Sequence, residues 1–164
     1  MRRVLLPALL LVALSACATA PVEYRQVWKV DFVCPAGAPP SPENWGYDIG
    51  TDWGNQQLEF TTNRTTNSAL DGAGRLVITA RREDFNGRAY TSARLTTAGK
   101  REFTYGRFEA RMRLPVGQGL WPAFWMLGAD LPRVGWPQSG EIDIMEYRGQ
   151  EPNVNHGSIH GPGY

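Results

Sequence analysis

The sequence of 164 residues predicts an all-β fold, an antiparallel sandwich or jelly roll. Short stretches that alternate between polar and apolar residues recur along the chain, and turn residues separate them. The sequence contains no long amphipathic helical pattern. Its 18 Gly and 12 Pro supply turns, and its six Trp, six Tyr and six Phe supply flat rings. A loop-rich β domain with aromatic binding surfaces fits this composition better than a helical bundle.

Residues 1–16 predict a bacterial lipoprotein signal peptide. Two arginines precede an apolar stretch, residues 4–14, which is too short to span a bilayer comfortably. The following Leu-Ser-Ala-Cys resembles a lipobox, in which Cys17 becomes the lipidated first residue, and residues 17–26 form a short tether. We therefore expect a lipid-anchored protein of the bacterial cell envelope. The alternative is cleavage after Ala20 and a periplasmic or secreted protein.

Residues 27–164 are expected to form one globular domain. The net charge of +1 argues against a nucleic-acid partner, and we expect a monomer. Lipidation of Cys17 would leave Cys34 as the single cysteine of the mature chain, so no internal disulfide is expected. Cys34 itself is predicted to be a small buried residue.

The expected strands follow one another with turns between them. Residues 27–33 form the opening strand, and a proline-rich loop follows. Residues 75–81 alternate, and Asn86-Gly87 predicts a hairpin turn that leads into a return strand at 90–97.

The alternation is clear in residues 106–114, where every second residue from Phe108 is apolar and is expected to point inward. Residues 119–127 are almost continuously apolar, which favours either a buried strand or a strand in a deep cleft. A further strand begins at residues 158–160.

Residues 141–146 combine three carboxylates with apolar residues in an alternating pattern. Glu141 and Asp143 share one face of a strand, whereas Glu146 has the wrong parity. A β-bulge around Met145 would return Glu146 to that face. The two Glu Cα atoms would then lie roughly 13 Å apart, and side chains leaning inward bring the carboxyls to about 5 Å, as a retaining glycosidase requires. The alternative is an ordinary solvated strand face.

The stretch around these carboxylates resembles glycoside hydrolase family 16, particularly its bacterial endo-β-1,3-glucanases (laminarinases). Trp53-Gly-Asn-Gln-Gln-Leu-Glu-Phe, residues 90–97, Gly119-Leu-Trp-Pro-Ala-Phe-Trp-Met-Leu-Gly, residues 141–146 and His156-Gly-Ser-Ile-His-Gly-Pro-Gly carry the resemblance. They occur in the order that the family uses, over residues 28–164.

The resemblance implies a jelly roll of two antiparallel curved sheets (concanavalin-like) with a sugar chain in the concave cleft. Glu141 matches the nucleophile, Glu146 the acid/base and Asp143 the assisting residue between them. The expected reaction is endo-acting, retaining hydrolysis of β-1,3-glucan (laminarin-type) or mixed-linkage β-glucan through a covalent glycosyl-enzyme intermediate. No cofactor is expected. No metal site is predicted, because the opening strand only partly matches the calcium site of many family members.

The resemblance also suggests which residues bind the substrate. Trp121, Trp125 and Trp136 are candidate stacking platforms, although either of the first two could belong to the core. Asn55 and Arg94 match positions that hydrogen-bond sugar hydroxyls, and His160 is a weaker candidate. The expected substrate-binding residues are Trp121, Trp125, Trp136, Asn55, Arg94 and His160.

The chain is short for such a domain. Residues 17–164 are fewer than the roughly 200–250 of a typical one-domain sandwich, so the jelly roll is expected to be C-terminally incomplete. Exposed sheet edges and apolar faces would then be an aggregation hazard. The alternative functions are a non-catalytic glycan-binding lipoprotein, a truncated inactive family member, and a related hydrolase or transglycosylase acting on galactan or xyloglucan.

Overall fold

The computed structural model describes residues 22–164, in which ten short strands and one short helix form the regular structure. The predicted all-β class is confirmed. The predicted signal peptide and Cys17 lie outside the described residues, and so do residues 18–21 of the tether. Within the described part of the chain, no helix is long and apolar enough to cross a membrane.

The strands are β1 (Gly46–Tyr47), β2 (Glu59–Thr61), β3 (Ser68–Leu70), β4 (Leu76–Ile78), β5 (Arg81–Phe85), β6 (Arg88–Ser92), β7 (Leu95–Thr96), β8 (Ala123–Leu127), β9 (Glu141–Glu146) and β10 (His156–His160). The helix α1 (Leu131–Val134) is a single turn between β8 and β9.

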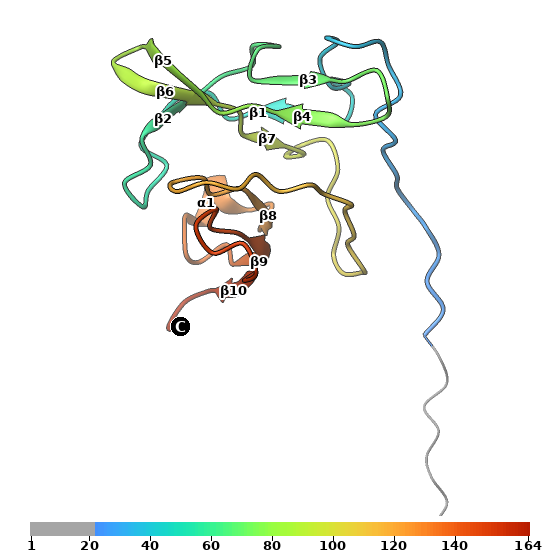
Figure 1. Ribbon diagram of the computed structural model, residues 1–164. Coiled ribbons are helices and arrows are strands. Elements are labelled where there is room, and N and C mark those ends of the chain that lie inside the picture. Colours follow the sequence, from blue (N-terminus) through green and yellow to red (C-terminus); the bar gives the residue numbers. More distant parts are fainter. Residues whose placement is uncertain (1–21) are drawn as a thin grey trace, which may run out of the picture.

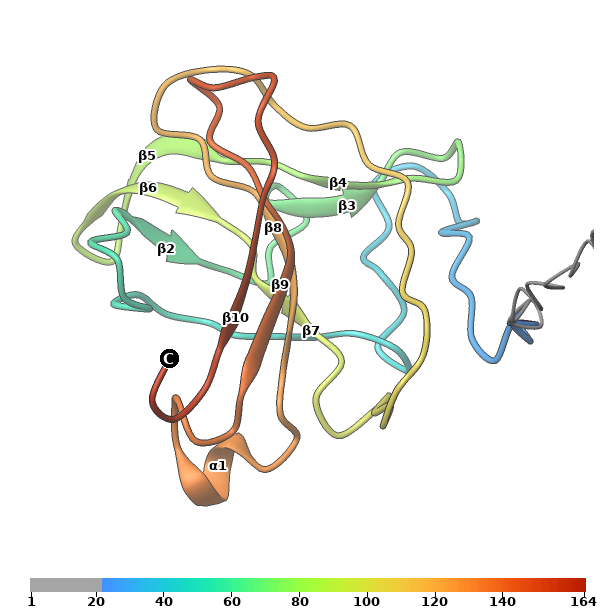
Figure 2. The same cartoon turned by 90° about the horizontal axis from the view of Figure 1, so that it is seen from below.

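The strands lie in two layers (Figure 1). Strands β1 to β7 gather on one side, and β8, β9 and β10 lie on the other side together with α1. The first layer contains the pairs β1–β7 and β3–β4 and the sheet β2-β6-β5, and the second is the antiparallel sheet β10-β9-β8. One pair departs from the antiparallel expectation, since β2 and β6 run parallel. Figure 2 shows β8, β9 and β10 running together as one narrow sheet.

The hairpin predicted at Asn86-Gly87 is confirmed as the turn between β5 and β6. Both residues have positive φ, 47° and 78°, as a type I′ turn requires. This turn twists in the same sense as the strands that it joins, so the two strands stay paired.

Two predicted strands are wrong. Residues 27–33 and 106–114 are extended or irregular, and neither pairs with a strand among the described residues. An alternating sequence makes a strand only where a second backbone accepts its N–H groups and donates to its C=O groups. Residues 75–81, predicted as one strand, are divided between β4 and the start of β5.

The prediction that Cys34 is buried is also wrong, because its side chain is exposed. It lies directly before a turn in which the Ala38 N–H donates to the Pro35 carbonyl. The turn keeps this segment on the surface of the first layer.

The centre of the first layer is polar. Asn67 is fully buried and its amide nitrogen donates to the Thr79 carbonyl and to Thr91 Oγ1, at 3.1 and 2.9 Å. The Thr62 hydroxyl donates to Asn67 Oδ1 at 2.6 Å. These bonds satisfy the buried amide and tie β6 to the residues that directly follow β2 and β4.

Candidate active site

The β-bulge predicted in residues 141–146 is confirmed. Opposite β8, Met145 pairs with Phe124 and Asp143 pairs with Trp125, so Ile144 has no partner of its own. The extra residue restores the parity of Glu146, which pairs with Ala123. All three carboxylates of β9 therefore lie on one face of the sheet.

Each carboxylate on this face has its own hydrogen-bond partner. The Trp136 indole Nε1 donates to Glu141 Oε2 at 2.7 Å. The Ser158 hydroxyl donates to Glu146 Oε2 at 3.3 Å. Asp143 Oδ2 lies 3.0 Å from His160 Nε2, across the pair β9–β10. These contacts orient the three acids, of which Glu141 and Glu146 stay partly exposed.

Asp143 is the most buried of the three, with 6% of its surface exposed. Burial raises the pKa of its carboxyl above the ordinary value, and the negative charges of Glu141 and Glu146 raise this pKa further. His160 acts in the opposite direction and lowers the pKa of Asp143. Asp143 is therefore suited to hold a proton between the two glutamates.

One group of side chains is close enough to share a cation. Donor atoms of Glu141, Asp143 and His160 lie within 4.8 Å of one another. The same side chains are already engaged with Trp136 and with each other through hydrogen bonds. These bonds account for the cluster, and no metal site is assigned to it.

The Arg94 guanidinium stacks on the Trp125 ring. The Arg94 guanidinium lies 4.6 Å from the centre of the Trp125 ring and 4.8 Å from that of Trp53. Its Nε donates to Asp48 Oδ2 at 2.9 Å. Since Arg94 precedes β7 and Trp125 lies in β8, this stack joins the two layers.

The other predicted substrate-binding residues lie at different places. Trp136 is 58% exposed beside Glu141, with its ring 6.1 Å from that of His160. Trp121 is 41% exposed and lines a cavity of about 240 Å³ next to Glu146. Asn55 is exposed in the loop before β2 and adopts positive φ. The structure therefore brings Trp136 and His160 close to Glu141, and Trp121 close to Glu146.

Sequence reasoning missed several residues of the site. Ser158 contacts Glu146, and Asp48 and Trp53 hold Arg94. The alternation of β10, with His156, Ser158 and His160 on one face, was a signal that could have found Ser158. The partners of Arg94 lie too far apart in sequence for any local pattern to show them.

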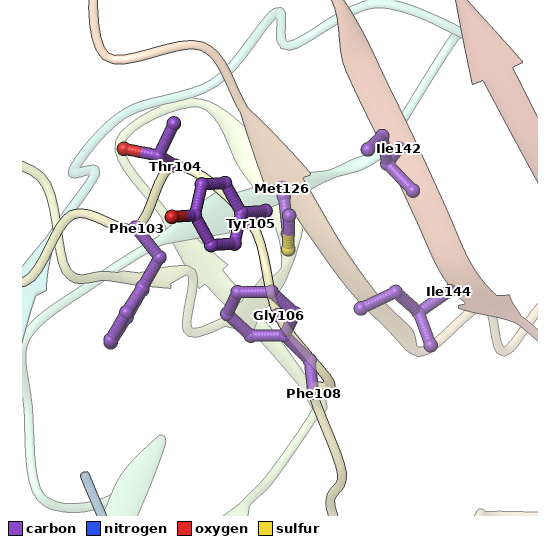
Figure 3. Close-up of a pocket in the computed structure, with 8 residues that line it drawn as sticks. All are labelled: Phe103, Thr104, Tyr105, Gly106, Phe108, Met126, Ile142 and Ile144. Carbon is purple, nitrogen blue, oxygen red and sulfur yellow. The ribbon is translucent and has the colours of Figure 1, made fainter. Parts of the chain in front are cut away.

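The opposite face of the same sheet is apolar (Figure 3). Met126, Ile142 and Ile144 of β8 and β9 face the rings of Phe103 and Phe108 across a groove of about 460 Å³. The sheet thus separates a carboxylate face from an apolar face.

The comparisons with known proteins agree with this geometry. The family model of glycosyl hydrolases family 16 matches residues 47–164. The chain is 49% identical over 145 residues to a β-glucanase of Rhodothermus marinus, covering 86% of this chain and 50% of that protein. It is 40% identical over 154 residues to a glucan endo-1,3-β-glucosidase of Cryptopygus antarcticus, covering 90% of this chain and 54% of that protein.

A solved structure shows the same fold. The laminarinase from Rhodothermus marinus superposes with a TM-score of 0.81 at 47% sequence identity, covering 87% of this chain and 57% of that one. The chain thus spans about half the length of the relatives it matches. The family match begins at the last residue of β1, covers β2 to β10 and includes the bulged strand with its three carboxylates. The chain belongs to glycoside hydrolase family 16.

Proposed function

We propose that the protein is an endo-acting, retaining glycoside hydrolase that cleaves β-1,3-glucan or mixed-linkage β-glucan. The observation that carries this proposal is the bulged strand β9, which presents Glu141, Asp143 and Glu146 on one face. The names of the relatives, a β-glucanase, a glucan endo-1,3-β-glucosidase and a laminarinase, support a β-glucan as the substrate.

In the first step of this mechanism, a carboxylate oxygen of Glu141 attacks the anomeric carbon of the sugar. The bond from that carbon to the glycosidic oxygen breaks, and Glu146 gives its proton to the departing oxygen. The Trp136 N–H on Glu141 Oε2 fixes the orientation of the nucleophile. A glycosyl ester on Glu141 and a free sugar chain result.

In the second step, water attacks the same carbon and releases Glu141. Glu146, now ionised, takes the proton from the water and returns to its starting state. Asp143 lies between the two glutamates in sequence and holds its proton more firmly than an ordinary Asp. While it is protonated, it can donate a hydrogen bond to Glu141 and adds no negative charge to the site.

The test is reducing-sugar release from laminarin, with Glu141→Gln and Glu146→Gln as matched variants. Both should lose at least about a thousandfold in kcat, since each removes a group that acts on the reacting atoms. Proton NMR of the first product should show the β-anomer, because retention requires two inversions. Folded wild-type protein that binds laminarin without releasing sugar would favour the glycan-binding alternative. A parallel assay on lichenan, agarose and xyloglucan separates β-1,3-glucan from the other polysaccharides.

We further propose that Cys17 carries a lipid that anchors the protein, as a monomer, to the bacterial cell envelope. The apolar stretch 4–14 and the lipobox-like residues before Cys17 support this proposal. Cys17→Ser should move the protein from the membrane fraction to the soluble fraction, and intact-mass spectrometry should show the loss of the acyl chains. An unacylated wild-type protein that begins at Pro21 would support the secreted alternative. Sedimentation velocity in detergent measures the oligomeric state.

A further inference from the structure

A cavity of about 240 Å³ adjoins Glu146. Its lining residues are Trp121, Glu146, Arg148, His156 and Ser158, and neither Glu141 nor Asp143 is among them. The cavity therefore belongs to the acid/base end of the carboxylate face. A retaining glycosidase delivers its proton to the oxygen that stays with the leaving sugar, so this sugar must lie against the acid.

The backbone places Arg148 opposite Trp121. The Tyr147 N–H donates to the Pro122 carbonyl at 3.1 Å, and the Gly149 N–H donates to the Leu120 carbonyl at 2.8 Å. These two bonds continue the antiparallel pairing of β8 and β9 beyond the bulge. They flank the position at which Trp121 and Arg148 lie opposite each other. Arg148 also has the parity of Glu146, two residues before it, and therefore shares its face.

The Arg148 guanidinium is partly held in place and partly free. Its Nη2 lies 2.9 Å from Glu151 Oε2 and 3.1 Å from His156 Nε2. Because a guanidinium can only donate, His156 Nε2 is the acceptor in the second contact. The donors on Nε and Nη1 have no protein partner among residues 22–164, and 48% of the side chain is exposed.

We propose that Arg148 and Trp121 form the recognition site for the leaving sugar. The inference rests on the proposed function and assigns a specificity-determining role to Arg148. The Trp121 ring stacks on the apolar face of a hexose, and the free donors of Arg148 hydrogen-bond its hydroxyl groups. Glu151 neutralises the guanidinium charge, so the site suits an uncharged sugar better than an anionic one.

The experiment compares two substrates that differ only on the leaving side. One is a β-1,3-linked glucose oligosaccharide, whose leaving group is a sugar. The other is the β-fluoride of the β-1,3-linked glucose trisaccharide, whose leaving group is a fluoride ion. Arg148→Ala should lower kcat/KM for the oligosaccharide about 10- to 100-fold, as expected for the loss of a charge-assisted hydrogen bond. The value for the fluoride should not change, because fluoride fills no part of the cavity.

Arg75→Ala is the matched control. Arg75 also pairs with a nearby acid, Asp71, but it is exposed on the turn between β3 and β4. This variant should behave as the wild type on both substrates. Arg148→Lys keeps the charge without the planar fork and should fall between wild type and Arg148→Ala on the oligosaccharide alone. If Arg148→Ala lowers the melting temperature of the protein, Arg148→Lys replaces it in the comparison of the two substrates.

The outcomes separate this inference from the proposed function. If the wild type cleaves both substrates and both Arg148 variants match it, or lose equally on both substrates, the leaving-sugar site is wrong and the hydrolase stands. If the wild type cleaves neither substrate, the hydrolase is wrong and the site falls with it. A loss of kcat/KM that is confined to the oligosaccharide supports both the hydrolase and the leaving-sugar site.

Discussion

Asp143 combines burial with two neighbouring negative charges, and its protonation therefore affects stability as well as chemistry. Because its pKa is raised above the ordinary value of 3.8, the folded protein keeps this proton at pH values where the unfolded chain has lost it. The resulting stabilisation is fully present below pH 3.8 and is lost as the pH rises through the raised pKa. Ionised Asp143 therefore lowers the stability of the folded protein relative to the protonated form.

We predict that Asp143→Asn raises the free energy of unfolding at neutral pH by about 1 kcal/mol, because it removes this charge and keeps a hydrogen-bonding side chain. The decline of stability with rising pH should become shallower. Urea unfolding over a series of acidic to neutral buffers measures both effects.

Asp71 is the matched control for this measurement. A side-chain hydrogen bond from Arg75, together with the N–H of Ala73, lowers the pKa of Asp71. Its stabilisation is present above the ordinary pKa and is lost as the pH falls, so Asp71→Asn should change the pH profile in the opposite direction. Two variants with the same pH profile would contradict the assignment.

The Trp136 N–H donates a hydrogen bond to Glu141, which would give this residue a role besides the predicted stacking on the sugar. Trp136→Phe keeps an aromatic ring and removes only the donor. We expect kcat/KM for laminarin to fall about tenfold or more, which corresponds to the roughly 1.5–3 kcal/mol of a hydrogen bond to a charged group. Trp28→Phe is the control, because the Trp28 indole also donates a bond, 3.3 Å to Asn44, in the N-terminal segment. An equal effect of both substitutions would exclude a specific role of the Trp136 donor.

At the scale of the element, the bulge in β9 decides which side chains lie on the carboxylate face of the sheet. Ile144 has no partner on β8, so deletion of Ile144 should turn β9 into a regular strand and leave Glu146 opposite Ala123. Deletion of Ile142, which is also apolar and pairs with Met126, should instead move Glu141 to the other face relative to Asp143.

We therefore expect laminarin hydrolysis to survive deletion of Ile144, with lower thermal stability, and to disappear on deletion of Ile142. Circular dichroism checks that both proteins fold, and the reducing-sugar assay compares them. A folded but inactive protein lacking Ile144 would show that the bulge itself, rather than the parity it restores, is needed for catalysis.

The bulge could be predicted because side-chain parity is a local property of the sequence. The five-residue spacing of Glu141 and Glu146 fits one face only if the strand contains an extra residue. The strand predicted at residues 106–114 was wrong because strand pairing is not a local property. Alternation reveals an amphipathic segment, but it does not show whether a second backbone pairs with it. The stack of Arg94 on Trp125 could not be predicted either, because Asp48 and Trp125 lie far from Arg94 in the sequence.

At the scale of the whole molecule, the sheet β10-β9-β8 has an open apolar face. The groove between this sheet and the segment around Phe103 exposes several large apolar side chains; Tyr105, for example, is 89% exposed. Contiguous apolar surface of this kind favours association with other apolar molecules. We therefore expect the aggregation hazard predicted from the sequence to lie at this groove.

We predict that the hydrophobic dye ANS binds the folded protein in this groove. Ile142→Thr should weaken dye binding severalfold and lower aggregation on heating, because it places a polar atom in the lining without changing the branching of the side chain. Ile159→Thr is the control. Ile159 pairs with Ile142 and is 65% exposed, but it does not line the groove. Equal dye binding by the two variants would place the site elsewhere.

The buried amide of Asn67 has a consequence for the time scale of local opening. Its bonds reach Thr91 of β6 and the residues that directly follow β2 and β4, so each of these three segments is held to the same buried side chain. Such a centre opens as a unit rather than by fraying from one edge. The amide protons around Asn67 should therefore exchange with deuterated solvent only in the slowest phase, long after those of the exposed segment at residues 106–114.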